Sequence, residues 1–302
     1  FCKGKLMINA IRSIAIIVSL FLTVDATAQQ WRPVGGSRNA TISGIALVEQ
    51  GKDQATFLVV HDNKKKDQLR ISLITINGTS ALKLDPLKWI GDEIPVDLEA
   101  ATAVPNAPNE FLVLASEGRV FHIALDRTAN SVNLLRSLDL PSKPKDADFE
   151  GFALQLIENK LVAVWADRGA TERPATLFWG RIDISKSTFS SIASAEFRVP
   201  IPLSDVRHIS DIKVDTTGAV FVTAASDPGD DGPFSSAFYY AGVVKTADAG
   251  PISFLPSKEL TRLYSFRYNK VEAFDLLPGP ASGIVFGSDD EDLGASIFTT
   301  FP

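Results

Sequence analysis

Short runs of β-branched and aromatic residues recur along the chain after residue 30, and turn-forming residues bound each run. No long stretch in this part of the chain keeps an apolar stripe at helical spacing without a glycine, a proline or a β-rich break. The pattern therefore predicts an all-β protein. The predicted strands cover residues 55–60, 69–76, 110–115, 120–125, 160–166, 220–225 and 283–287.

A four-residue unit recurs five times among these strands. It consists of an apolar residue, then Ser or Glu, then a small or acidic residue, then an apolar residue, and its copies are spaced about 50 to 60 residues apart. The residues at the second position are Ser43, Glu99, Glu150, Ser210 and Glu272. After each unit come a second strand that ends near an acidic turn and then a third strand, a succession typical of a β-propeller blade.

The fifth copy leaves too few residues at the end of the chain for a fourth strand. Residues 30–34, just before the first copy, can supply the missing strand and remove an exposed sheet edge. The sequence thus predicts a five-bladed β-propeller over residues 29–302, a single domain closed by pairing of the N- and C-terminal strands. The alternative is an all-β sandwich in which the five similar units are accidental.

The first residues carry a different signal. Basic residues up to Arg12 precede an apolar run over 14–24, which ends at the small residues Ala26, Thr27 and Ala28. This predicts a secretory signal peptide over residues 1–28, because the run is shorter than a membrane-spanning helix requires. We therefore expect an exported protein, periplasmic or extracellular. Its single cysteine, Cys2, lies before the cut, so no disulfide is expected.

The charge of the chain excludes some classes of partner. The net charge is −6 and the isoelectric point is near 5.2. Nucleic acid and anionic membrane surfaces are not expected partners, because both require a basic footprint.

The five repeated positions would form a ring, because the first strand of each propeller blade lines the central channel. Three carboxylates held close together must either take up protons or gain a cation. Oxygen ligands without His or Cys select a hard ion, so calcium is the predicted metal at this ring and magnesium the second choice. The alternative is that the same side chains only solubilise a water-filled channel mouth.

The order Ser, Glu, Glu, Ser, Glu on the innermost strands resembles the calcium-activated nucleotidase (apyrase) family, in which such a ring holds a central calcium ion. The strings at 148–153 and 287–294 also resemble a group of bacterial exported propellers described as phytase-like or esterase-like. The nucleotidase pattern has several basic residues at the ends of second strands. This chain departs from it, with Arg168 there, Lys65 and Arg119 as further candidates, and Asp227 in the fourth blade.

A metal in the channel would support attack of water on a phosphate or other ester. Asp62 or Asp167 could orient the water as general base, and Arg168 could clamp a phosphate. Arg119, Asp227 and Asp289 complete the predicted substrate-binding set. The alternative for these acids is a place in solvated hairpin turns.

The predicted function is that of an exported calcium-binding propeller that binds or hydrolyses a small anionic ligand such as a phosphoester. The rival interpretation is a non-catalytic propeller that holds a protein or a glycan, with a purely structural ion. The aromatic cluster at 238–240 is a candidate surface for that partner. The sequence leaves open whether the protein is an enzyme.

Overall fold

The computed structural model describes residues 30–34, 40–78, 80–247, 250–279 and 282–301. All described strands belong to one compact unit, Trp31–Pro302. The predicted signal peptide lies outside the described residues and remains a prediction. Within the described ranges, no helix has both the length and the apolar character needed to cross a membrane.

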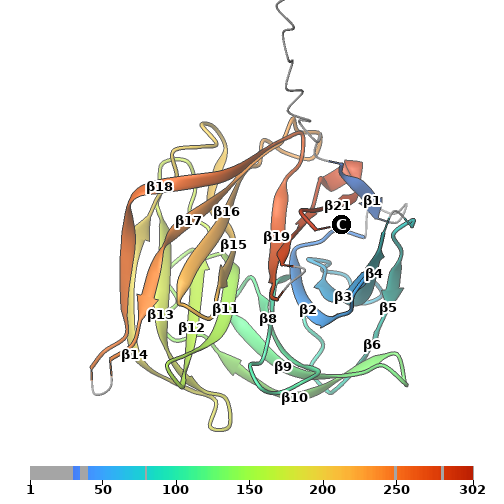
Figure 1. The fold of residues 1–302 in the computed structure, drawn as a ribbon, viewed down its shortest axis with the longest axis horizontal. Helices are drawn as coiled ribbons and strands as arrows, with labels where there is room; N and C mark the ends of the chain where they lie inside the picture. The colour runs from blue at the N-terminus through green and yellow to red at the C-terminus, as the bar shows by residue number, and fades with distance from the viewer. Residues whose placement is uncertain (1–29, 35–39, 79, 248–249, 280–281, 302) are drawn as a thin grey trace, which may run out of the picture. The chain divides into compact units, whose positions relative to one another are not determined.

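Five sheets, antiparallel except for one edge strand in blade 2, form the blades of a propeller, as the repeat predicts (Figure 1). Blade 1 consists of β2 (Gly44–Gln50), β3 (Gln54–Val60), β4 (Ile71–Asn77) and β5 (Leu84–Pro86). Blade 2 consists of β7 (Leu98–Ala103), β8 (Glu110–Ala115), β9 (Arg119–Asp126), β10 (Ser131–Asp139) and β6 (Lys88–Ile90). Blade 3 consists of β11 (Phe149–Ile157), β12 (Lys160–Asp167), β13 (Ala175–Asp183) and β14 (Thr188–Phe197).

Blades 4 and 5 complete the circle. Blade 4 consists of β15 (Val206–Val214), β16 (Ala219–Ser226), β17 (Ser235–Lys245) and β18 (Ser253–Arg267). Blade 5 consists of β19 (Val271–Leu277), β20 (Gly283–Ser288), β21 (Ala295–Thr299) and β1 (Arg32–Val34). The first strands β2, β7, β11, β15 and β19 contact one another in this order, and β19 contacts β2, so they enclose a channel.

The two ends of the propeller chain meet in blade 5. β1 pairs with β21 in antiparallel register, with Arg32 opposite Ile297 and Val34 opposite Ala295. Val34 and Ile297 are both buried in the apolar core between blades 5 and 1. The predicted closure of the propeller is confirmed.

The small residue at the third position of the repeat has a packing cause. A Cβ added to Gly44 would lie 2.7 Å from Cα of Ala100, on the next first strand. A Cβ added to Gly151 would lie 2.6 Å from Cγ1 of Ile212. Neighbouring first strands therefore approach so closely at the channel that a larger side chain would displace one of them.

Two features of the fold differ from expectation. β6, in the connection between blades 1 and 2, adds a parallel edge strand to β10. It is too short to show an alternating pattern, and Trp89 fixes it by packing edge-on against Phe121 at 5.7 Å. The aromatic cluster at 238–240 is not the exposed partner surface expected for a binding propeller, because Phe238 and Tyr239 are fully buried in β17.

Candidate functional site at the channel mouth

The three ring glutamates all sit at β-bulges where the first strand of the blade begins to pair with the second. In blade 2 the pairs Leu98–Ala115 and Ala100–Leu114 leave Glu99 without an opposite residue. The same interruption occurs at Glu150 in β11 and at Glu272 in β19. A bulge re-aims a side chain while the strand continues, which explains why a charged residue stands in an otherwise buried strand.

Arg207 is the centre of the charge network at this mouth. Its Nη1 lies 2.6 Å from Oε1 of Glu272 and 3.5 Å from Oε1 of Glu150, and its Nη2 donates to Asp227. The oxygens of Glu150 and Glu272 are therefore no more than about 6 Å apart. Arg168 adds a second guanidinium, with Nη1 at 3.0 Å from Glu150 and Nη2 at 2.9 Å from Asp148.

The pKa values of two ring carboxyls, Glu150 and Glu99, are raised. Burial raises the pKa of Glu150 to about 7, although the charges of Arg207 and Arg168 act in the opposite direction. The pKa of Glu99 is raised well above its ordinary value, first by burial and then by the negative charges of Glu150 and Asp62. Such carboxyls can hold a proton near neutral pH, which ordinary surface acids do not.

Lys270 forms the other cationic centre. Its Nζ lies 3.3 Å from Glu272 and 3.6 Å from Asp289, and it donates to Glu291. Burial and the charge of Glu272 raise the pKa of Asp289 well above its ordinary value. Asp289 therefore belongs to the network around the ring and not to a solvated turn, since it is 1% exposed.

Asp62 lies at the edge of the same network and accepts a hydrogen bond from Oγ1 of Thr41 at 2.8 Å. Burial and the charge of Glu272 raise its pKa. It also lines a cavity of 270 Å³ beside the ring, together with Asn63, Lys64 and Glu291. Asp62 thus faces, together with Glu291, a space that can hold a small ligand.

The ring serines bear on the predicted calcium ion. Ser43 and Ser210 are buried, and within the described residues their hydroxyl oxygens have no hydrogen-bond partner, so each still has its bonding capacity for a water or an ion. The glutamates fit calcium less well. No three acidic or histidine side chains of the described ranges converge as metal ligands, and Arg207 lies where the charges of Glu150 and Glu272 meet. Calcium remains a prediction, and no chemical step is derived through it.

The structure brings Asp62, Arg168, Asp227 and Asp289 together around the ring, but it places two other predicted site residues in structural ion pairs. Asp167 is fully buried, pairs with Arg173 and accepts the backbone N–H of Asp148 at 3.1 Å. Arg119 is bound to Glu93 at 2.9 Å and to Asp139 at 3.0 Å in blade 2. Neither arrangement leaves the side chain directed to a ligand at the mouth.

Arg207 and Lys270 contact most of the carboxylates of the site, and neither was predicted from the sequence as a site residue. Arg207 stands three positions before Ser210, and Lys270 two positions before Glu272. Basic residues close before the repeated position were the available signal. A further cavity, of 810 Å³, opens at the opposite end of the first strands and contains none of the ring residues.

The architecture and the channel define the class of the protein, a five-bladed β-propeller with a charged central channel. The chain matches no family model, and no curated protein sequence matches it significantly. Several solved structures share its fold. One is an α-L-arabinofuranosidase from Podospora anserina in complex with cellotriose, with 10% identity, a TM-score of 0.52, and coverage of 91% of this chain and 98% of that chain.

A second similar structure is the catalytic domain of a GH62 α-L-arabinofuranosidase from Coprinopsis cinerea, with 10% identity and a TM-score of 0.49 over 90% of this chain and 97% of that chain. A third is a GH43 β-1,3-galactosidase with galactodeoxynojirimycin, with 10% identity and a TM-score of 0.45 over 86% of this chain and 90% of that chain. At this level of identity the likeness shows the fold alone.

Proposed function

We propose that the channel mouth beside Asp62 binds a neutral carbohydrate and hydrolyses a glycosidic bond by acid–base catalysis. The observation that carries the proposal is the pair of neighbouring carboxyls in different environments. The pKa of Asp62 is raised by burial and by the charge of Glu272. Glu272 is held between Arg207 at 2.6 Å and Lys270 at 3.3 Å. Two carboxyls whose surroundings differ in this way can divide the acid and base roles.

The proposed reaction assigns each proton. Asp62 donates its proton to the glycosidic oxygen as the bond from that oxygen to the anomeric carbon breaks. Water attacks the anomeric carbon, and Glu272 accepts the proton that the water loses. The role of Asp62 differs from the predicted general base, because burial and the charge of Glu272 raise its pKa and so favour its protonated form.

The charge balance of the mouth favours a neutral ligand. Arg168, Arg207 and Lys270 each contact at least two carboxylates. An anionic ligand would have to displace one of these partners, whereas sugar hydroxyl groups can bond to carboxylates and guanidinium groups alike. The glycoside hydrolase of known structure named above, with cellotriose bound, is further support from a propeller of the same architecture.

The test is a hydrolysis screen with the wild type, Asp62→Asn, Glu272→Gln and the control Asp53→Asn. Asp53 is an exposed acid in a hairpin of the same blade. The substrates are 4-nitrophenyl glycosides, natural oligosaccharides and 4-nitrophenyl phosphate. We expect cleavage of at least one glycoside, a loss of roughly 10²-fold or more in both site variants, and no loss in the control. Asp62→Asn should retain more activity on the nitrophenyl glycoside, whose leaving group needs little protonation.

Other outcomes separate the alternatives. Calcium-dependent cleavage of the phosphate ester without glycoside cleavage would overturn the proposal in favour of the phosphoesterase interpretation. Glycan binding by the wild type with no hydrolysis of any substrate would replace it with the non-catalytic binding propeller.

A further inference from the structure

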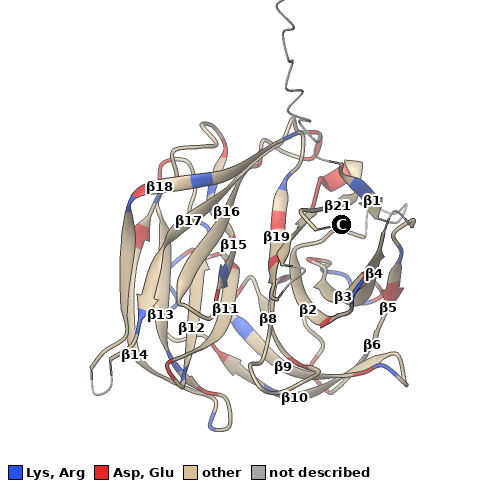
Figure 2. Ribbon diagram, in the orientation of Figure 1, with Lys and Arg blue, Asp and Glu red and all other residues tan. Residues whose placement is uncertain are grey.

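Each first strand carries a second equivalent position beyond the ring residue, and these five positions are named the second ring. It lies three positions after each residue of the first ring, and it consists of Ala46, Thr102, Ala153, Lys213 and Asp275. Three of these residues are small, whereas Lys213 and Asp275 bring opposite charges from the neighbouring blades 4 and 5. β19 carries one acidic residue of each ring, Glu272 and Asp275, and Figure 2 shows red segments along this strand.

Lys213 spans the channel at the level of the second ring. Its Nζ lies 2.8 Å and 3.1 Å from the two carboxylate oxygens of Asp211, and it donates to the carbonyl of Ala101 at 3.2 Å. Ala101 belongs to blade 2 and Lys213 to blade 4, so the lysine side chain reaches across the channel past the intervening blade. All three ammonium protons thereby have acceptors.

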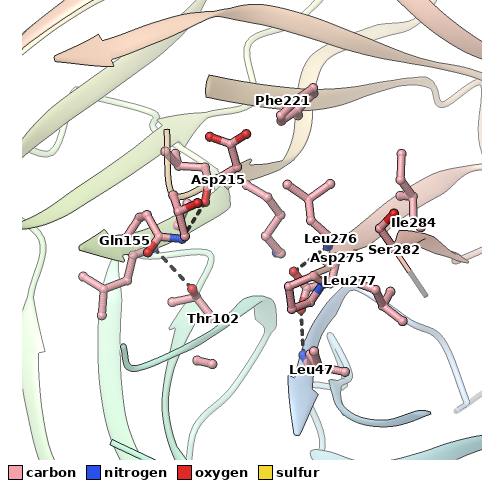
Figure 3. A pocket seen from close by; sticks show the side chains of 18 of the residues that line it. Leu47, Thr102, Gln155, Asp215, Phe221, Asp275, Leu276, Leu277, Ser282 and Ile284 are labelled. Atoms are coloured by element: carbon pink, nitrogen blue, oxygen red, sulfur yellow. Dashed lines mark hydrogen bonds between the residues drawn. The ribbon is translucent and has the colours of Figure 1, made fainter. Parts of the chain in front are cut away.

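A large cavity, with a volume of 810 Å³, lies next to Lys213 at the end of the channel opposite the glutamate ring. Leu154, Phe221 and Leu276 are among the apolar side chains that line it, and Figure 3 shows Phe221 on one side of the space and Leu276, with Asp275 next to it, on another. The volume lies within the usual range for pockets that take up small molecules. Apolar walls with a few polar groups are also the usual composition of such pockets.

The charge of the cavity is unbalanced. Lys213 pairs with Asp211, and its charge also acts on Asp275, so one cation stands beside three acids, Asp211, Asp215 and Asp275. Backbone N–H groups of Leu47 and Leu276 hold Asp275 at 2.6 Å and 2.8 Å, one on each carboxylate oxygen. Each oxygen accepts a single bond there, so a further donor can still be accepted. The carboxylate is therefore fixed in position and complementary to a cation.

We propose that this cavity, at the end of the channel opposite the glutamate ring, binds a small organic cation with an amine head and an apolar body, and that Asp275 is its counter-ion. The apolar body contacts the walls around Leu154, Phe221 and Leu276, and the ammonium group donates to Asp275. The site is independent of the proposed glycosidase chemistry, because no residue of the first ring lines it.

The test is calorimetric titration of the whole protein with three probes of matched shape: 4-phenylbutylamine, the neutral 4-phenylbutan-1-ol and the anionic 4-phenylbutanoate. We expect the amine to bind about tenfold more tightly than the alcohol, and the acid to bind least. Asp275→Asn should remove the preference for the amine and leave alcohol binding unchanged. Glu150→Gln, at the other mouth, should leave all three affinities unchanged.

A second variant keeps the test valid if Asp275→Asn does not fold. Ala103→Trp places a large side chain at an exposed position of the cavity rim and leaves Asp275 in place, so it should weaken the amine and the alcohol alike. Equal affinity for amine and alcohol in the wild type would overturn the proposal, as would preferred binding of the acid or no binding of any probe. A loss of amine binding in Glu150→Gln would show that the probe binds at the glutamate ring and not in the cavity at the opposite end.

Discussion

Replacing Arg207 with Gln removes the charge that three carboxylates share. Its guanidinium contacts Glu272 at 2.6 Å, Glu150 at 3.5 Å and also Asp227, and its side chain is 17% exposed. Removal of one partner from a buried ion pair costs about 3–5 kcal/mol, because the remaining charges stay buried without compensation. We expect a loss of that size in the free energy of unfolding at a pH near 8, measured by urea denaturation.

The loss should depend on pH. Arg207 lowers the pKa of Glu150 against the larger effect of burial, so its removal moves that pKa further above 7. A carboxyl whose pKa is raised in the folded state contributes stability at low pH and loses it as the pH rises through the folded value. The penalty of Arg207→Gln should therefore be smaller by about 1–2 kcal/mol at a pH near 5 than near 8.

The matched control is Arg127→Gln, which breaks an exposed pair with Glu49. Exposed pairs contribute at most about 1 kcal/mol, so the control should be nearly neutral at both pH values. An equal penalty for Arg207→Gln at the two pH values would refute the argument from Glu150. A penalty no larger than that of the control would refute the central role of Arg207.

The variant Arg207→Gln also tests whether a calcium ion can bind at the ring. Without the guanidinium, Glu150 and Glu272 face each other without a shared cation, and the free hydroxyl oxygens of Ser43 and Ser210 lie in the same ring. A cation that binds only the folded state raises its stability, by about 2.7 kcal/mol at a hundred times its dissociation constant. We expect calcium to raise the melting temperature of Arg207→Gln more than that of the wild type. The opposite order would mean that the ion and Arg207 occupy different places.

Three further predictions concern stability. Glu150→Gln should flatten the fall in stability that the wild type shows as the pH rises from about 4.5 to about 7, a difference of about 3 kcal/mol in urea denaturation. An unchanged pH profile would contradict the raised pKa. Phe238→Ala should cost about 3–5 kcal/mol, because its fully buried ring packs 4.9 Å from Phe274 and 5.2 Å from Phe286, and a cost below about 1 kcal/mol would contradict this packing. Val34→Asp should lower the melting temperature sharply, since it buries a charge where β1 closes the ring, whereas the exposed neighbour Pro33→Ala should have little effect.

The fold was predictable because two independent patterns agree. Runs of apolar residues marked the strands, and the repeated unit fixed both the number of blades and the residues that begin each first strand. Even the closing strand followed from the count, since the fifth blade lacked a fourth strand in sequence. β6 was not predictable, because three residues in a connection carry no period and pair only through tertiary contacts.

The partners of the ring were less predictable than the ring itself. Arg207 bonds to Glu272 across 65 positions of sequence, and no local spacing encodes such a contact. Asp167 shows the opposite case. Arg173, six positions later, neutralises it in a local turn. An opposite charge so close in the sequence indicates a structural ion pair and not a catalytic role.

Blade 4 gives the channel its asymmetry. Its first strand, β15, departs from the repeat in two ways: three residues, 208–210, oppose one residue of β16, and Asp211 stands where the other blades have Gly or Ala. The enlarged bulge places Arg207 before the ring position, where it reaches Glu150 and Glu272. Asp211 in turn holds Lys213 across the channel.

One strand thus supplies Arg207, one of the three cations at the glutamate ring, and Lys213, which lines the cavity at the opposite end. A propeller built from identical blades would place the same side chain at every position of each ring, and five like charges around one axis would repel. The departures in β15 remove that symmetry at two levels, one at the carboxylate-rich mouth and one beside the largely apolar cavity that Asp275 and Asp215 line. If both proposals hold, the two ends of the channel bind chemically different ligands, and Lys213, held by Asp211 and the carbonyl of Ala101, lines the cavity at the end opposite the glutamate ring.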